Sequence, residues 1–114
     1  MKNQTGNRRN SLRHRTDPIY AKVACGLTLY PGFISNLGEF GLKLHVEKDL
    51  KDSNFSVIIP TKEEISNGFL ILQSEKKWIK KEENHGLYLI GCEFINVSDK
   101  KKQQIQQLIE MMKK

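Results

Sequence analysis

Short runs of apolar residues, separated by polar and turn-forming residues, occupy the chain from about position 19 to position 95. Apolar and polar positions often alternate within a run, so that Leu42, Leu44 and Val46 fall on one face of an extended segment. The runs predicted as strands are 19–25, 27–30, 33–35, 42–46, 55–59, 69–73 with a continuation through 76–81, and 87–95. Many short strands with frequent turns predict a mostly β barrel or sandwich, and a closed barrel leaves no exposed sheet edge.

Pairs of turn-forming residues divide these runs. Pro31-Gly32 predicts a turn or a bulge, and Asn67-Gly68 predicts a turn ahead of the long strand that starts at 69. Pro60 stands at the end of another run, where its missing N–H costs no ladder hydrogen bond. The turn residues therefore support the strand boundaries that the alternation predicts.

The end of the chain has a helical rather than a strand-like period. Ser98 is a suitable N-cap, and Asp99 suits the first turn of a helix. The spacing i, i+3, i+4, i+7 predicts a helix over about 99–113 that packs one apolar stripe on the barrel, formed by Ile105, Leu108, Ile109 and Met112.

The first 17 residues contain almost no apolar side chains apart from Met1 and Leu12. Such a segment buries too little surface to offset the entropy of ordering it, so we expect residues 1–17 to form a flexible arm. Asp17-Pro18 ends the arm with an extended entry into the domain. The expected organisation is therefore an arm followed by a barrel with a C-terminal helix, over 18–114.

Length and composition fit a single water-soluble domain, because the 114 residues are 38% hydrophobic and 28% charged. No window approaches the ~18 apolar residues of a membrane span, and the polar N-terminus lacks the apolar core of a secretory signal, so we expect a cytoplasmic protein without membrane contact. Cys25 and Cys92 lie in separate strand-like segments without metal-ligand spacing, which predicts buried reduced thiols and no metal site.

The net charge of +6 is concentrated at the two ends of the chain. Residues 1–20 carry five Lys or Arg against one Asp, and residues 100–114 carry five Lys against one Glu, whereas 21–99 carry nine Lys against eleven acidic residues. All four arginines lie in the first segment, at positions 8, 9, 13 and 15. Because arginine suits bidentate recognition of phosphates and guanine edges, this segregation indicates an anionic ligand held by the arm.

Two motifs follow in order. The arm contains Arg8 and an R-x-x-x-R pair, Arg9 and Arg13, and the segment 32–44 contains Asn36-x-Gly38-x-x-Gly41. With the last strand-like segment G-C-E-F-I at 91–95 and the capped helix, this arrangement resembles the PilZ domain family, whose loop pattern is [D/N]-x-S-x-x-G. The resemblance extends from Arg8 to about position 109.

The resemblance implies a six-stranded antiparallel β-barrel that binds cyclic di-GMP as its ligand, without a cofactor and without catalysis. Its ligand-binding residues would be Arg8, Arg9, Arg13, Asn36, Gly38 and Gly41. The chemistry agrees, because an Arg fork matches the O6 and N7 acceptors of guanine, and an asparagine amide both donates and accepts at the N1 edge. Glycines let the backbone approach closely and turn sharply.

Position 38 departs from the family pattern, because Gly38 replaces the family serine. The loss of one hydroxyl hydrogen bond costs about 1 kcal/mol, or roughly a fivefold change in affinity. We expect weaker binding rather than none if both arginines of the pair are used.

Two alternative functions remain open at this point. A PilZ-like adaptor without a ligand would bind only proteins, and a small basic-armed barrel can bind single-stranded nucleic acid. The scattered aromatic residues and the slightly acidic barrel body argue against nucleic acid. Trp78 is interpreted as strand packing covered by lysines, and His45 as an ordinary strand residue. No Ser–His or carboxylate–His spacing predicts catalysis.

Overall fold

The computed structural model describes residues 13–62, 65–83 and 86–112, with residues 13–18 and Met112 described by their backbone alone. Arg8 and Arg9 of the predicted site lie outside these ranges. The elements in chain order are β1 (Arg13–Cys25), β2 (Thr28–Gly38), β3 (Gly41–Val46), β4 (Asn54–Pro60), β5 (Phe69–Glu82), β6 (Leu87–Phe94) and α2 (Asp99–Met112).

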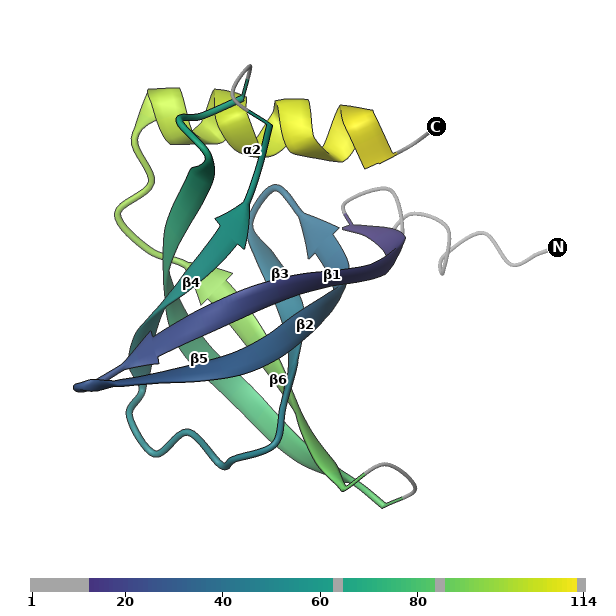
Figure 1. The fold of residues 1–114 in the computed structure, drawn as a ribbon, viewed down its shortest axis with the longest axis vertical. Helices are drawn as coiled ribbons and strands as arrows, with labels where there is room; N and C mark the ends of the chain where they lie inside the picture. The colour runs from purple at the N-terminus through teal and green to yellow at the C-terminus, as the bar shows by residue number, and fades with distance from the viewer. Residues whose placement is uncertain (1–12, 63–64, 84–85, 113–114) are drawn as a thin grey trace, which may run out of the picture.

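The strands form a closed barrel in the order β1-β2-β3-β6-β5-β4, in which every neighbouring pair is antiparallel (Figure 1). The pairing of β1 with β4 closes the barrel. The predicted antiparallel β-barrel with a C-terminal helix is therefore confirmed, and the long strand predicted over 69–81 is a single strand, β5.

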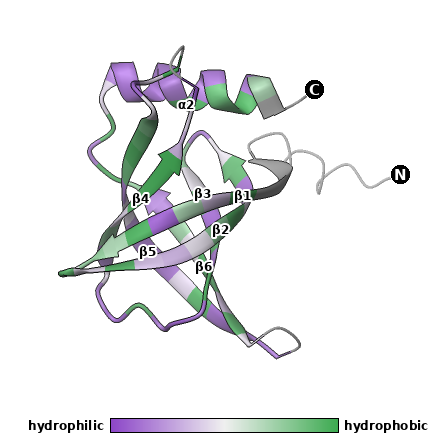
Figure 2. Ribbon diagram, in the orientation of Figure 1, coloured by the Kyte–Doolittle hydropathy of each residue, from purple (hydrophilic) through white to green (hydrophobic). Residues whose placement is uncertain are grey.

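The interior is filled by alternate residues of the strands, and Figure 2 shows this alternation of hydropathy along the ribbon. In β3 the side chains of Leu42, Leu44 and Val46 are at most 1% exposed, as the sequence pattern predicts. Among the described side chains, Ser74 is the buried polar residue of the core, and its Oγ donates to the carbonyl oxygen of Leu72 at 3.1 Å. That hydrogen bond offsets the cost of burying the hydroxyl.

The β1–β2 hairpin has a two-residue loop, because Cys25 is paired directly with Thr28. Gly26, the first loop residue, has a φ of 62°. A positive φ is required at this position in the two-residue turns whose twist matches that of the paired strands. At its other end the strand begins at Arg13, six residues before the predicted start at 19 and within the range expected for the arm. The backbone of 13–15 pairs with that of 36–38, so pairing with β2 extends a strand that local hydropathy does not predict.

The turn or bulge predicted at Pro31-Gly32 is wrong, because β2 runs through both residues and both pair with β1 without a register shift. Pro31 pairs with Lys22 of β1, whereas the last pair of β2 with β3 is Gly32 with Val46. Pro31 therefore lies beyond the end of β3, where its missing N–H breaks no ladder hydrogen bond. The irregularity of β2 falls instead between Ile34 and Asn36.

The helix α2 lies across one end of the barrel (Figure 1). It starts one residue after Ser98, whose Oγ accepts a hydrogen bond from the backbone N–H of Lys101 at 3.2 Å, as the predicted N-cap should. Its buried residues are Ile105, Leu108 and Ile109. Among the described residues, no helix combines the length and the apolar composition that a membrane crossing needs.

Candidate functional site

One row of outward-facing residues crosses four neighbouring strands of the barrel. Asn36 of β2 is paired with Lys43 of β3, Lys43 with Gly91 of β6, and Gly91 with Trp78 of β5. The adjacent pair Leu37–Leu42 is fully buried, so the row, one residue along, faces outward. We call Asn36, Lys43, Gly91 and Trp78 the outer row, and its three interstrand spacings amount to about 14 Å.

Trp78 at one end of the outer row lies directly on Gly91. A Cβ added to Gly91 would come within 2.2 Å of Cε2 and Nε1 of the indole, so only glycine leaves room for the ring. The other side of the ring remains accessible, since Trp78 is 42% exposed. A register shift between Lys76 and Trp78 sets this position. The predicted strand packing is thus present, but the ring also offers a flat aromatic surface to solvent.

Asn36 at the other end of the outer row is held at a β-bulge. Ser35 has no partner in β3, so that Ser35 and Asn36 both stand between the pairs formed by Ile34 and Leu37. Asn36 Oδ1 is a buried side-chain oxygen without a hydrogen-bond partner among the described residues. Because such an atom costs about 1–3 kcal/mol, it indicates that a donor belongs there.

The backbone of Arg13, the second arginine of the R-x-x-x-R pair, reaches the same corner. Arg13 is paired with Gly38, and Arg15 with Asn36, which places the start of β1 beside the outer row. Three of the predicted site residues, Arg13, Asn36 and Gly38, are therefore brought together by the β1–β2 pairing.

The two motif glycines are buried strand residues. Gly38 ends β2, Gly41 begins β3, and Gly41 is paired with Glu93 of β6. Neither is among the described glycines with positive φ, which are Gly26, Gly68 and Gly86. The expected sharp turn at the motif therefore does not use a left-handed glycine.

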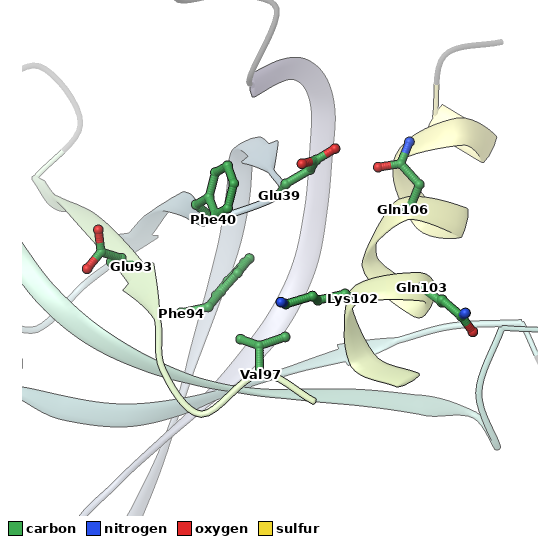
Figure 3. A pocket seen from close by; sticks show the side chains of 8 residues that line it. All are labelled: Glu39, Phe40, Glu93, Phe94, Val97, Lys102, Gln103 and Gln106. Atoms are coloured by element: carbon green, nitrogen blue, oxygen red, sulfur yellow. The ribbon is translucent and has the colours of Figure 1, made fainter. Parts of the chain in front are cut away.

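A cavity of about 550 Å³ lies beside the motif, between the 39–40 turn, the end of β6 and the helix α2 (Figure 3). Phe40, Phe94 and Val97 form its apolar wall, and Lys102 extends into it from α2. Phe40 is 62% exposed, so its ring packs only partly against the barrel. No residue of the outer row lines the cavity, and its described lining residues include no buried side-chain polar atom without a partner.

Sequence reasoning missed a second polar cluster on this face. His45 is hydrogen bonded to Ser35 and to Glu82, residues that are 10 and 37 positions away. Such separations show no motif spacing, and the contacts depend on how β2, β3 and β5 are arranged around the barrel. The lone histidine within an alternating strand was the available signal.

Neither the thiols nor the carboxylates form a metal site among the described residues. Cys25 and Cys92 are buried, as predicted, and both are reduced thiols rather than parts of a disulfide. Burial raises the pKa of the Cys25 thiol, whose Sγ donates to Asp52 Oδ2 at 3.6 Å. The thiol is therefore protonated at neutral pH and a poor nucleophile.

The comparisons with known proteins concern the family and the fold. The model of the family described as the PilZ domain matches residues 7–111 of the chain. No curated protein was found to match it.

Several solved structures are similar in fold. The chain matches the PilZ domain with c-di-GMP of YcgR from Escherichia coli at a TM-score of 0.70 and 13% identity, covering 89% of this chain and 88% of that one. It matches the Bacillus subtilis inhibitor of motility MotI/DgrA at 0.66 and 12%, covering 88% and 48%. It matches the Borreliella burgdorferi PlzA protein in complex with c-di-GMP at 0.61 and 15%, covering 97% and 49%. The chain thus spans about half the length of the latter two.

Proposed function

Because the chain belongs to the PilZ domain family, we propose that it is a non-enzymatic receptor domain for cyclic di-GMP. Two of the three solved structures described above are complexes with this dinucleotide. In this chain, the observation that carries the proposal is the buried Asn36 Oδ1, which has no partner among the described residues and lies at the end of the outer row.

The outer row matches the chemistry of a guanine dinucleotide. Asn36 Oδ1 accepts a hydrogen bond from the N1 or amino group of one guanine, which satisfies the unpartnered oxygen. The exposed face of Trp78 provides a stacking surface for a base, and base–aromatic stacking is worth about 1–3 kcal/mol. Lys43, between them, contributes a positive charge towards a phosphate.

The arm supplies the remaining contacts in this proposal. Arg8, Arg9 and Arg13 bind guanine edges and phosphates, and the four-residue step from Arg9 to Arg13 reaches up to about 13 Å when extended. That reach is close to the width of the outer row. Closing the arm over the ligand creates a new surface for a downstream protein, which couples the level of the dinucleotide to a bacterial signalling output.

Calorimetric titration with cyclic di-GMP tests the proposal directly. We expect binding in the micromolar range or tighter, and losses of roughly ten- to a hundredfold for Arg9→Ala and for Arg13→Ala, because each removes charge-assisted hydrogen bonds. Lys22→Ala is the matched control, since Lys22 is an exposed cation on β1, and its affinity should remain that of the wild type.

Tryptophan emission gives a second, independent measurement. Trp78 is the single tryptophan of the chain, so a stacked base should change its emission on titration. No heat and no change in emission would contradict the proposal. A protein partner captured equally well with and without the dinucleotide would then favour the adaptor function, and a gel shift of oligonucleotides would favour nucleic-acid binding.

A further inference from the structure

Ser35, His45 and Glu82 form a hydrogen-bonded chain on the outer face of the barrel. His45 Nε2 lies 2.7 Å from Ser35 Oγ, and His45 Nδ1 lies 2.8 Å from Glu82 Oε1. The ring of Phe33 stacks on the imidazole, with centroids 4.4 Å apart and an interplanar angle of 4°. The His45 side chain is only 11% exposed, so both its nitrogens and one of its ring faces are held by protein groups.

The chemistry of the three groups fixes the direction of the hydrogen bonds. An ionised carboxylate accepts only, so Nδ1 carries a hydrogen and donates it to Glu82. In neutral His45, Nε2 is therefore an acceptor, and the Ser35 hydroxyl donates its hydrogen to Nε2. In protonated His45, Nε2 donates to Ser35 Oγ instead, which frees the hydroxyl hydrogen for another acceptor.

Ser35 lies beside Asn36, the end residue of the outer row. It is the bulged residue immediately before Asn36, on the face that carries the outer row. It also offers a hydroxyl close to the motif, which has Gly38 where the family pattern has serine. We propose that Ser35 is a further ligand-contacting residue, and that its hydroxyl donates to the ligand only when His45 is protonated. This inference rests on the proposed function.

The charged groups around His45 come from two strands. Glu82 and Lys80 lie on β5, where Lys80 is paired with Leu89, the β6 partner of His45. Lys43 lies two positions before His45 in the sequence, and Glu47 lies two positions after it. The strand β2 contributes the uncharged Phe33 and Ser35. Of these charged groups, Glu82 is the one that forms a hydrogen bond with the imidazole.

The test is the pH dependence of cyclic di-GMP affinity, measured by calorimetry between about pH 5.5 and 8, where histidines titrate and the ligand does not. We expect the wild type to bind roughly three- to tenfold more tightly at the acidic end, with proton uptake visible as a dependence of the heat on the buffer. Ser35→Ala and His45→Gln should each lose most of this dependence while still binding. Ser35→Thr should keep it, because it keeps the hydroxyl.

The other two histidines provide controls. His14→Gln and His85→Gln should retain the pH dependence of the wild type, and either variant that abolished it would overturn the proposal. A Ser35→Ala variant with the full wild-type dependence would also overturn it, since His45 would then act through charge alone. Tight but pH-independent binding by the wild type refutes the Ser35 contact and leaves the receptor function intact, whereas no binding at any pH refutes both.

Discussion

At the scale of single residues, the candidate site depends on residues that position a neighbouring side chain or are positioned by a neighbour. Gly91 has no catalytic or binding chemistry of its own, but it is the surface on which the Trp78 indole lies. Asn36 is likewise placed by the bulge at Ser35, which leaves its buried Oδ1 without a partner among the described residues. Residues of this kind orient a recognition surface by packing and register rather than by charge.

Gly91→Ala should therefore displace the indole. A Cβ would lie 2.2 Å from two indole atoms, so the ring must move, and we expect a loss of about 1–3 kcal/mol in the free energy of unfolding. The emission of Trp78 should shift towards that of a more solvated tryptophan, and ligand affinity should fall.

A double-mutant cycle with Trp78→Ala separates this contact from any other effect of the alanine. Trp78→Ala removes the three atoms nearest to the added methyl, so the penalty should largely disappear. Equal penalties in the two backgrounds would show that the Gly91–Trp78 contact is not the cause.

At the scale of elements, the helix α2 completes the core that the barrel leaves open at one end. Its buried residues Ile105 and Ile109 are each 1% exposed, and its contacts with the rest of the chain include Gln104 Nε2 donating to the carbonyl oxygen of Ile65 at 3.0 Å. The helix also forms one wall of the cavity beside the motif. Its packing therefore stabilises the fold and shapes the surroundings of the site at the same time.

Ile105→Ala should lower the free energy of unfolding by about 2–5 kcal/mol, because it removes three buried methyl or methylene carbons and leaves a cavity. Urea unfolding measures this directly. Gln107→Ala, at an exposed position of the same helix, is the control and should change stability by no more than about 0.5 kcal/mol. Similar values for the two variants would mean that α2 does not seal the core.

At the scale of the whole molecule, positive charge is concentrated at the ends of the sequence and the body is close to neutral. The paired start of β1 joins the basic N-terminal segment to the corner that holds Asn36 and Gly38. A strongly basic segment beside a polar recognition surface attracts an anionic ligand by long-range charge interactions, which the nearly neutral barrel alone does not provide.

Ligand affinity should consequently fall with ionic strength. Screening at about 0.5 M salt shortens the range of charge interactions to a few ångströms, and we expect the dissociation constant to rise roughly three- to tenfold relative to 50 mM salt. Arg9→Ala should show a flatter dependence, because one of the screened interactions is already absent. An affinity that does not change with salt would contradict the electrostatic role of the arm.

Much of the architecture followed from the chain alone. The alternation in 42–46 predicted a strand with the observed buried face, and the apolar run 55–59 predicted the strand that is observed as β4. The capped stripe from Ser98 to Ile109 predicted α2. Local signals were wrong or incomplete where pairing decided the outcome. Pro31 did not interrupt β2, since it lies past the end of β3, and β1 began earlier than its apolar residues suggested.

The sequence by itself determined which residues face inward, where the basic arm and the Asn–Gly motif lie, and which family pattern they resemble. Only the tertiary structure decided that Asn36, Lys43, Gly91 and Trp78 form one row, and that His45 meets both Ser35 and Glu82. The physical reason is that a period of two residues specifies the face of a strand but not its neighbour. The register of pairing around the closed barrel sets the neighbours, and it is fixed by packing of the whole core.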